Sequence, residues 1–329
     1  MPDPHQPTRR VLVVGIDGVR LDLLPELATP RLDEVVAAGF LAPVRIDSGT
    51  PTMSGPCWAT IATGVHITKH AVWNNDFSGN RLAIYPDFLT RLNHGFGRRT
   101  YVAAGWEPLV LARSGGPLFN GPSRLSFAAP AEESCEEWEA VDEQMVRDAV
   151  RVLREEDPEA TFVYLGAVDE TAHLRGCGDD YRGAILRADE RLGRLLDAVR
   201  ARPGYPDEAW TVIVVTDHGH VDEGGHGGDS ELERTAWIAC CGPDFTPGQR
   251  VAQLRHVDVA PQVFASLGLR ADRHWTLDGL PFAESAAAAA AVAAVTTSVS
   301  QPLPAVSIGA NGSAPGYQRA SYSHTTQPA

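Results

Sequence analysis

The strongest constraint on the fold comes from one apolar run, WTVIVVTDHG at residues 210–219. Every position from Val212 to Val215 is apolar, so no side of this segment is suited to contact water. A strand of this kind is buried on both faces, which is typical of a parallel sheet covered by helices. The run therefore predicts a sheet that lies between two layers of helix.

Strand-like and helix-like segments alternate along the rest of the chain. Further strands are predicted at 10–18, 100–105, 161–169 and 235–242, and helices at 30–39, 137–155, 181–200 and 257–267. This order predicts a doubly wound α/β/α sandwich with a mostly parallel sheet. Ligands bind to such sheets beyond the carboxyl ends of the strands.

The composition changes after about Glu284. Residues 285–329 are rich in Ala, Ser, Thr, Pro and Gly, and Arg319 is the only charged side chain among them. Such a segment buries too little apolar surface to order itself. We therefore predict one folded domain over 1–284 and a flexible tail over 285–329.

Acidic side chains follow three of the predicted strands, and histidines lie close to two of these positions. A helix that begins at Asp169 would place His173, four residues later, on the same face. Carboxylate and imidazole groups together suit two Zn²⁺ ions. The candidate metal ligands are Asp17, Asp169, His173, Asp217, His218 and His226.

Each of these residues also has an ordinary structural explanation. An Asp at the end of a strand is often a turn former or a helix N-cap. His173 could be a surface residue, His218 a packed imidazole, and EGGHGG a flexible loop; it is not a phosphate loop, because no G-K-[ST] follows. The coincidence of the whole set at the carboxyl ends of strands favours a site.

Ser54 is the candidate nucleophile. It follows a turn-rich stretch and precedes a helix pattern at 56–63. The positive potential of a helix N-terminus favours both an anionic nucleophile and an anionic substrate. A neighbouring metal ion would lower the pKa of the hydroxyl further. The alternative is that Ser54 only caps the helix.

Several segments together resemble the alkaline phosphatase superfamily, close to its type I phosphodiesterase/nucleotide pyrophosphatase branch. The similar segments, in the family's order from Val11 to about Phe282, are VLVVGIDGVRLDLL, SGPCWATIATGVHITKHAVWNN, YLGAVDETAH, VIVVTDHGH, HVDVAPQVFASLGL and LDGLPF. The resemblance implies that residues 1–284 form a catalytic domain that binds two divalent ions. It implies one ion on Asp169, His173 and His226, a second on Asp17, Asp217 and His218, Ser54 as nucleophile, and Asn75 as a donor to a phosphoryl oxygen.

The sequence departs from this branch at four points. Serine replaces the usual threonine at Ser54, and Ala71 stands where glycine is usual. His226 follows His218 by only eight residues, and the insert that shapes the nucleotide pocket is correspondingly short or absent.

Thr52 is a weaker candidate nucleophile. Trp73, Phe77, Trp106 and Tyr181 are either specificity residues or ordinary core aromatics.

These features predict a two-metal hydrolase of phosphodiesters or nucleotide pyrophosphates that acts through a phosphoseryl intermediate. A phosphomonoesterase with the same site and a non-catalytic metal-binding protein are the alternatives. A sulfatase is disfavoured, because Trp58 stands where that branch needs arginine. A phosphoglycerate mutase is disfavoured, because the chain has no room for that family's second domain.

Charge and cysteine content restrict the partners. The net charge of -14 argues against binding to duplex nucleic acid or to anionic membranes, and leaves a small phosphate ester as the expected partner. No run approaches the roughly 18–20 apolar residues of a membrane span. The five cysteines show no CxxC spacing, so we expect reduced thiols and a cytoplasmic protein.

Overall fold

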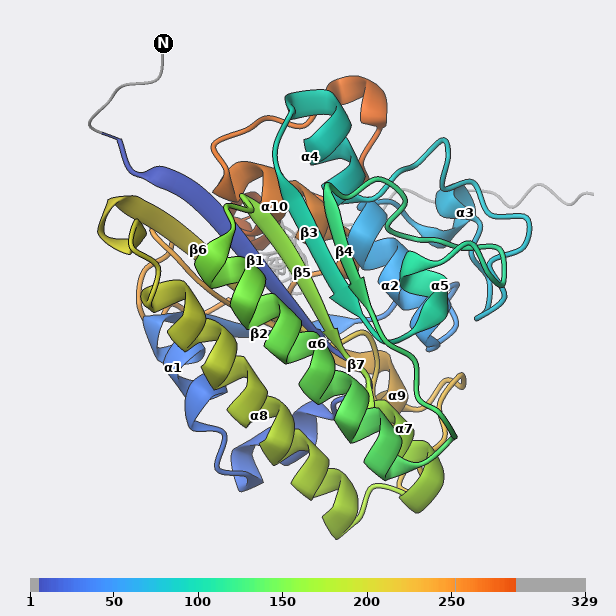
Figure 1. Ribbon diagram of the computed structural model, residues 1–329. Coiled ribbons are helices and arrows are strands. Elements are labelled where there is room, and N and C mark those ends of the chain that lie inside the picture. Colours follow the sequence, from blue (N-terminus) through green and yellow to red (C-terminus); the bar gives the residue numbers. More distant parts are fainter. Residues whose placement is uncertain (1–5, 252, 288–329) are drawn as a thin grey trace, which may run out of the picture. The chain divides into compact units, whose positions relative to one another are not determined.

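The computed structural model describes residues 6–251 and 253–287 and contains a seven-stranded sheet in the order β2-β7-β6-β1-β5-β3-β4 (Figure 1). The five strands from β6 to β4 run parallel, while β7 is antiparallel to both β6 and β2. The prediction of a mostly parallel sheet is confirmed. The strands are β1 Thr8–Ile16, β2 Gly39–Arg45, β3 Thr100–Ala104, β4 Arg124–Phe127, β5 Ala160–Leu165, β6 Glu208–Val215 and β7 Thr235–Cys241.

Helices cover both faces of the sheet. Apolar residues along β1 alternate between two cores: Val11 and Val13 face one layer, and Leu12 and Val14 face the other. The first layer holds α2 (Ser54–Thr63), α4 (Phe88–Phe96) and α10 (Val259–Ser266); the second holds α1 (Pro30–Ala38), α6 (Cys135–Glu155), α7 (Ala167–Arg175) and α8 (Asp179–Arg200). The sandwich prediction is therefore confirmed.

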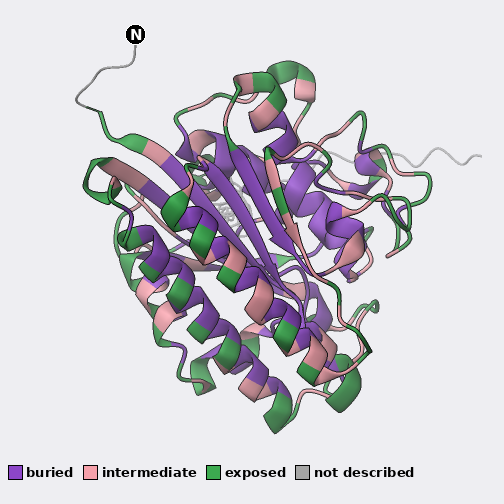
Figure 2. Cartoon of the chain, in the orientation of Figure 1, coloured by how far each residue is buried: buried purple, intermediate pink, exposed green. Residues whose placement is uncertain are grey.

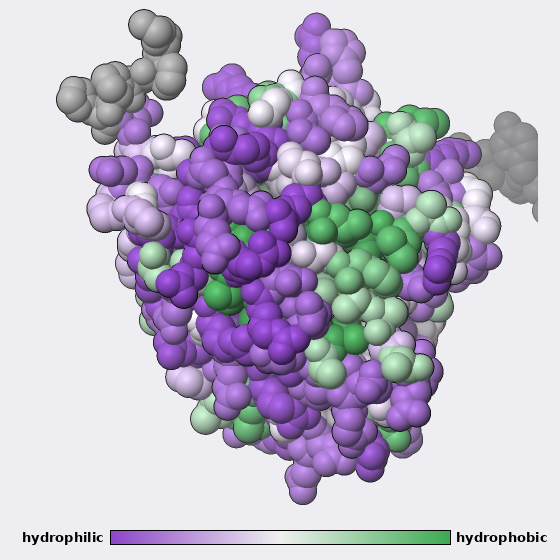
Figure 3. Space-filling model, in the orientation of Figure 1, coloured by the Kyte–Doolittle hydropathy of each residue, from purple (hydrophilic) through white to green (hydrophobic). Residues whose placement is uncertain are grey.

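The long helices show the expected division between a buried and an exposed side. Figure 2 shows buried strands behind α6 and α8, whose outer surfaces are exposed. Figure 3 shows the same outer surface as hydrophilic, with an apolar area beside it. Shorter helices lie in the connections: α3 Ile67–His70, α5 Glu107–Val110, α9 Glu231–Arg234, and 3-10 turns at Leu21–Glu26, Tyr205–Asp207, His256–Asp258 and Arg273–Trp275.

One predicted strand is too long. The strand expected at 161–169 ends at Leu165, and α7 begins at Ala167, so Asp169 lies in the first turn of a helix. The cause is Asp142, whose buried carboxylate accepts hydrogen bonds from the Gly166 and Ala167 N–H groups at 2.9 and 3.1 Å. This cap comes from a different helix, so the local sequence does not reveal it.

Two strands, β2 and β4, were not predicted. Pro43 within β2 has no N–H for a ladder, and proline of this kind is confined to edge strands. The structure agrees, because β2 and β4 form the two edges of the sheet. β4 has only four residues, and Pro43 interrupts β2, so each gives a weak sequence signal.

The predicted tail falls almost entirely outside the described residues, which end at 287. Ser285, at its start, is buried and donates a hydrogen bond to Asp258 Oδ2 at 2.7 Å. All five cysteines are free thiols. Among the helices of the described ranges, none combines the length and apolar character that crossing a membrane requires.

Candidate active site

Three adjacent parallel strands bring the predicted ligands together at the carboxyl ends of the central strands. Asp17 follows β1, α7 follows β5, and Asp217 follows β6. Because β5, β1 and β6 are neighbours, their carboxyl ends meet in one place. The structure brings all six predicted ligands together there, in two adjoining groups.

The first group, here the carboxylate cluster, consists of Asp17, Asp217 and His218. All three side chains are fully buried. His218 Nε2 lies 3.4 Å from Asp17 Oδ1 and 3.3 Å from Asp217 Oδ2. The second atom of each carboxyl group is occupied elsewhere. Asp17 Oδ2 accepts hydrogen bonds from the Trp58 indole and the Tyr164 hydroxyl, both at 2.8 Å.

The same division holds at Asp217 and His218. Asp217 Oδ1 accepts a hydrogen bond from the Gly18 N–H at 3.1 Å, and His218 Nδ1 lies 3.1 Å from the Gly219 carbonyl. This leaves Asp17 Oδ1 and Asp217 Oδ2 buried without a hydrogen-bond partner among the described residues. Each residue is thus held by one polar atom and directs the other into the cluster.

The second group, here the histidine cluster, consists of Asp169, His173, His220 and His226. Asp169 Oδ2 lies 3.4 Å from His173 Nε2, and Asp169 Oδ1 lies 3.6 Å from His226 Nε2. The Nε2 atoms of His173 and His226 are 2.9 Å apart. His220, which the sequence patterns did not select, places Nε2 2.9 Å from Asp169 Oδ1.

The short loop after β6 carries His226 back to this edge. Gly224 and Gly227 have φ of +95° and +104°, and a Cβ on Gly224 would lie 1.8 Å from the Ala172 carbonyl oxygen. His226 Nδ1 donates to the Thr52 carbonyl at 2.7 Å, and the His226 ring stacks on His218 with centroids 3.9 Å apart. The glycines of EGGHGG therefore permit close packing that seats His226 between the two clusters.

Ser54 lies beside the carboxylate cluster. It is the first residue of α2, and its Oγ is 3.4 Å from His218 Nε2. The alternative that Ser54 caps the helix is wrong, because Met53 occupies the N-cap position and makes no side-chain cap. Ser54 is only 5% exposed, so its hydroxyl faces the cluster interior rather than bulk water.

Thr52, the weaker candidate nucleophile, has a structural role. Its hydroxyl donates to the Gly228 carbonyl and accepts from the Gly227 N–H, both at 2.9 Å. With its carbonyl on His226, Thr52 makes three contacts with the loop that carries this histidine. Its oxygen is therefore occupied, whereas that of Ser54 faces the cluster.

Asn75 adjoins the N-terminus of α2. Its Oδ1 accepts a hydrogen bond from the Gly55 N–H at 2.8 Å. This bond orients the amide so that the Nδ2 donor is directed away from the helix, and no acceptor for it is found within residues 6–251 and 253–287. The amide can therefore donate to a ligand that binds next to Ser54.

Burial and neighbouring charges shift the pKa values of the residues in the carboxylate cluster. Burial, together with the nearby Asp169 charge, raises the pKa of Asp17 to about 7. Burial and the Asp17 carboxyl raise the pKa of Asp217 well above its usual range. Burial lowers the pKa of His218 well below its usual range. Without added positive charge the carboxylate cluster favours neutral forms.

The histidine cluster behaves differently. Burial alone would raise the pKa of Asp169, but the imidazoles of His173 and His220 hold it well below its usual range. The Asp169 carboxylate in turn raises the pKa of His173 to about 9. This cluster thus carries partly compensating charges, and His173 remains 40% exposed at its edge.

The donors fit divalent metal ions. Two groups of side chains each bring three possible ligand atoms within 4.8 Å of one another. One group is Asp17, Asp217 and His218, and the other is Asp169, His218 and His226. One buried oxygen on each of Asp17, Asp169 and Asp217 has no hydrogen-bond donor among the described residues. A bound cation would supply the missing partner. Imidazole with carboxylate is the ligand mixture that suits Zn²⁺. His218 belongs to both groups and lies between the clusters.

The predicted specificity residues separate into two kinds. Phe77 is fully buried, and Tyr181 is a core residue whose hydroxyl donates to the Gly18 carbonyl and accepts from the Arg20 N–H. Trp106 packs edge-on against Phe77. Trp73, two residues before Asn75, is 51% exposed, so it is the candidate among the four that can reach a bound substrate.

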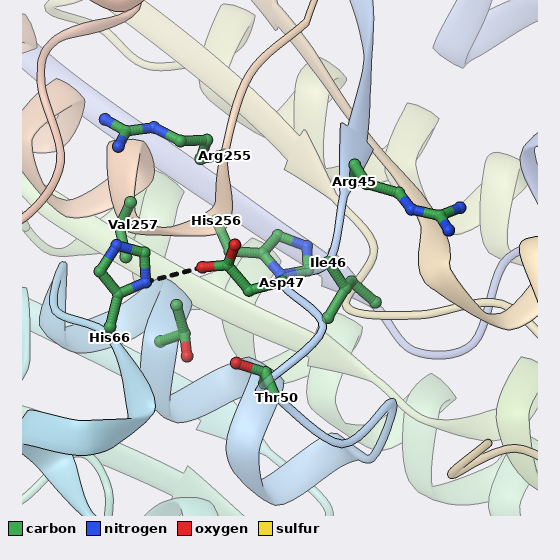
Figure 4. Close-up of a pocket in the computed structure, with 9 residues that line it drawn as sticks. Arg45, Ile46, Asp47, Thr50, His66, Arg255, His256 and Val257 are labelled. Atoms are coloured by element: carbon green, nitrogen blue, oxygen red, sulfur yellow. Dashed lines mark ion pairs between the residues drawn. The ribbon is translucent and has the colours of Figure 1, made fainter. Parts of the chain in front are cut away.

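A separate small cavity of about 30 Å³ lies between β2 and the 3-10 turn at His256–Asp258 (Figure 4). It has room for about one water molecule. Its charged groups are already paired: His66 with Asp47 at 3.0 Å, and Arg255 with Asp258 at 2.7 Å. None of its lining residues belongs to either cluster. It offers no free charge for a substrate.

Some residues of the site act by positioning others, and most of them have no signal in the sequence. Trp58, Tyr164 and Asp142 hold Asp17 or the start of α7, and they come from distant segments without a local signal. His220 had a signal, because DHGH places it two residues after a selected ligand. Only the fold shows that its ring turns toward Asp169.

Comparison with known proteins identifies similar chains. Ectonucleotide pyrophosphatase/phosphodiesterase family member 7 of Rattus norvegicus is 24% identical over 247 residues, covering 66% of this chain and 51% of that protein. The Homo sapiens protein of the same name is 25% identical over 232 residues, covering 64% and 47%. The chain spans about half the length of the curated relatives it matches.

Solved structures share the fold. Murine ectonucleotide pyrophosphatase/phosphodiesterase 5 superposes with a TM-score of 0.59 at 17% identity, covering 80% of this chain and 96% of that one. A putative sulfatase from Bacteroides thetaiotaomicron gives a TM-score of 0.64 at 12% identity, covering 84% and 74%. At the sequence level, the model of the type I phosphodiesterase / nucleotide pyrophosphatase family matches residues 11–235. The chain therefore belongs to the type I phosphodiesterase / nucleotide pyrophosphatase family.

Proposed function

We propose that this protein hydrolyses phosphodiesters or nucleotide pyrophosphates at the two clusters, with two divalent ions bound and Ser54 as nucleophile. The observation that carries this proposal is the position of the Ser54 hydroxyl. It lies at a helix N-terminus, 3.4 Å from Nε2 of His218, a predicted ligand in the carboxylate cluster, while the neighbouring Thr52 hydroxyl is occupied.

Two ions, for which Zn²⁺ suits the donors best, would neutralise the phosphoryl oxygens and activate the serine hydroxyl. Asp17, Asp217 and His218 would hold one ion, and Asp169, His173 and His226 the other. Divalent charge would also allow Asp17 and Asp217 to ionise together, which burial and the charges of neighbouring carboxylates oppose.

The chain's own groups define the reaction. Ser54 Oγ loses its proton to solvent and attacks phosphorus, so that a bond from Oγ to phosphorus forms. The bond to the leaving oxygen breaks, and that oxygen takes up a proton from solvent. Water then cleaves the phosphoseryl bond, releases the second product and restores serine. The N-terminus of α2 presents positive potential to the phosphoryl group throughout.

Asn75 favours a diester over a monoester. A monoester dianion carries more charge on its non-bridging oxygens, and a cation would match it better than a neutral amide does. Lys69, the nearest cation along the chain after Ser54, is paired with Asp278 at 2.5 Å and donates to the Thr276 carbonyl. It is therefore unavailable for this purpose.

The experiment is a substrate panel on metal-loaded protein. Bis-aryl, mono-aryl and nucleotide phosphates are compared by kcat/KM, and a quenched reaction is examined for a phosphoryl group on Ser54. We expect the aryl diester or the dinucleotide-type substrate to exceed the matching monoester. A clear monoester preference would replace this proposal with a phosphomonoesterase, and absence of turnover on every ester would replace it with a metal-binding protein.

A further inference from the structure

His220 is a buried imidazole with one nitrogen committed and one free. It is fully buried, and its Nδ1 lies 3.0 Å from the Gly224 carbonyl oxygen. A carbonyl can only accept a hydrogen bond, so Nδ1 carries a proton. In the neutral ring this fixes the tautomer and leaves a lone pair on Nε2.

That lone pair is directed into the histidine cluster. His220 Nε2 lies 2.9 Å from Asp169 Oδ1, yet both atoms are buried without a hydrogen-bond partner among the described residues. Two such atoms side by side are arranged like two ligands of one ion. In a tetrahedral zinc site with bonds of 2.0–2.1 Å, neighbouring ligand atoms are separated by about 3.3 Å.

Gly18 leaves the room that an ion needs. A Cβ at this position would lie 2.5 Å from His220 Nε2 and 2.8 Å from Asp169 Oδ1. The missing side chain therefore keeps open the space next to both atoms. Gly18 has φ of +68°, so its backbone conformation also favours glycine.

His226 is held in the same way as His220. His226 commits Nδ1 to the Thr52 carbonyl and presents Nε2 to His173 at 2.9 Å. The His220 ring lies 5.2 Å from the His226 ring and 5.4 Å from the His173 ring, measured between centroids. Three imidazoles and one carboxylate thus converge where the family resemblance implied two imidazoles and one carboxylate.

We propose that His220 is a direct nitrogen ligand of the ion in the histidine cluster, which makes that site a three-histidine, one-aspartate centre. This inference rests on the proposed two-ion function. Four protein ligands complete a tetrahedral shell, so a substrate oxygen must either raise the coordination number or displace a ligand. His173, the exposed member, is the ligand best able to move.

The ligand count also separates the two clusters in metal preference. Three imidazoles favour Zn²⁺ or Co²⁺ over Mg²⁺, whereas two carboxylates and one imidazole discriminate less. At equilibrium with excess Mg²⁺, the histidine cluster should therefore hold Zn²⁺ in a larger fraction of molecules than the carboxylate cluster does.

The competing explanation is that His220 only positions Asp169. In that case the ring carries protons on both nitrogens and donates to the carboxylate without touching an ion. Nuclear magnetic resonance distinguishes the two. The full chain is labelled with nitrogen isotope in histidine, loaded with the NMR-active isotope of cadmium, and examined for one-bond coupling between cadmium and each Nε2.

We expect four histidines with such coupling, and His220→Gln should remove one of them. The same variant should weaken cadmium binding at one of two sites by at least about tenfold. His256→Gln is the matched control, because His256 is also buried and contacts the Thr216 carbonyl outside both clusters. If His220→Gln does not fold, its signal is assigned in the parent chain by elimination, using His218→Gln, His226→Gln and His173→Gln.

The outcomes separate the two proposals. Two bound ions with a protonated, uncoupled His220 Nε2 would overturn the ligand role and leave the proposed function intact. Failure to bind two ions at all would overturn both. Unchanged affinity and unchanged coupling in His220→Gln would show that the fourth signal belongs to another histidine.

Discussion

The carboxylate cluster and the histidine cluster are neighbours that are held by different means. The first stands on the ends of β1 and β6, is fully buried, and is fixed by Trp58 and Tyr164. The second stands on α7 and on the glycine-rich loop that carries His226. Thr52, two residues before Ser54, forms hydrogen bonds with this loop. Parallel strand order brings the first cluster together, whereas the second is completed by His226 on a loop that a distant segment holds in place.

The largest expected effect separates the nucleophile from its neighbour. Ser54→Ala should reduce kcat by roughly three orders of magnitude or more, about 4 kcal/mol of barrier, with metal content unchanged. In the proposed mechanism the Ser54 hydroxyl makes the covalent bond, whereas the Thr52 hydroxyl holds the loop. Steady-state kinetics with elemental analysis measure both quantities.

Thr52→Val is the matched control. It removes a hydroxyl two residues away and loosens the loop that carries His226, so it should lower metal content at the histidine cluster while residual turnover persists. A dead Thr52→Val protein with full metal content, beside an active Ser54→Ala protein, would identify Thr52 as the nucleophile.

Metal content tests the difference between the clusters directly. Protein purified without chelator should contain two divalent ions per chain, and His226→Ala should empty the histidine cluster first and leave the other partly filled. Because His173 is 40% exposed while the carboxylate cluster is buried, a chelator should also remove the histidine-cluster ion faster. One ion or none in fully active protein would contradict the two-metal mechanism.

The two clusters also differ in how far the sequence could predict them. Asp17 and Asp217 follow strands that are apolar and easily recognised, so their meeting follows from parallel strand order. Helical spacing predicts a shared face for Asp169 and His173, and in α7 their side chains lie 3.4 Å apart, although the strand before them ends four residues earlier than expected. His220 and the supports Trp58, Tyr164 and Asp142 depend on side-chain direction across the fold, which no local pattern contains.

Asn75 tests a third element, which belongs to neither cluster. Asn75→Ala should cost about 1–3 kcal/mol in kcat/KM, the scale of one hydrogen bond to a charged group in the transition state. The loss should be larger for an aryl diester than for the matching monoester. Asn74→Ala is the control, because Asn74 is exposed and its side chain only accepts from the Asp76 N–H. An Asn75→Ala protein as active as the parent would remove this residue from the site.

Asp142 offers a pH test of the support beneath the histidine cluster. Burial raises the pKa of Asp142 from 3.8 to about 7 in the folded protein. Between these values the folded state binds more protons than the unfolded state, so this group's contribution to stability falls as pH rises. Asp142→Asn removes the titration but also loses one of the two hydrogen bonds at the start of α7, because an amide nitrogen cannot accept from a backbone N–H.

The variant should therefore be destabilised at pH 5, and its deficit should shrink by on the order of 2 kcal/mol by pH 8. Urea denaturation of metal-free parent and variant at both pH values measures this change. A deficit that stays constant or grows with pH would show that the folded carboxyl is ionised throughout, and would assign the support of α7 to a carboxylate with a low pKa.

The smallest expected effect concerns Ala71, on the segment that leads from α3 to Asn75. It has φ of +56° and ψ of +29°, a left-handed conformation that costs a non-glycine residue about 1–2 kcal/mol. Ala71→Gly relieves this strain, while the added freedom of the unfolded chain offsets about 0.4–1 kcal/mol. A net stabilisation of about 0.5 kcal/mol should appear in urea denaturation, with kcat unchanged because Ala71 contacts neither cluster.

Ala37→Gly, at an exposed position in α1, is the matched control and should destabilise by about 0.5–1 kcal/mol. Equal destabilisation by both substitutions would mean that Ala71 is not strained, and that the segment before Asn75 is as relaxed as an ordinary helix.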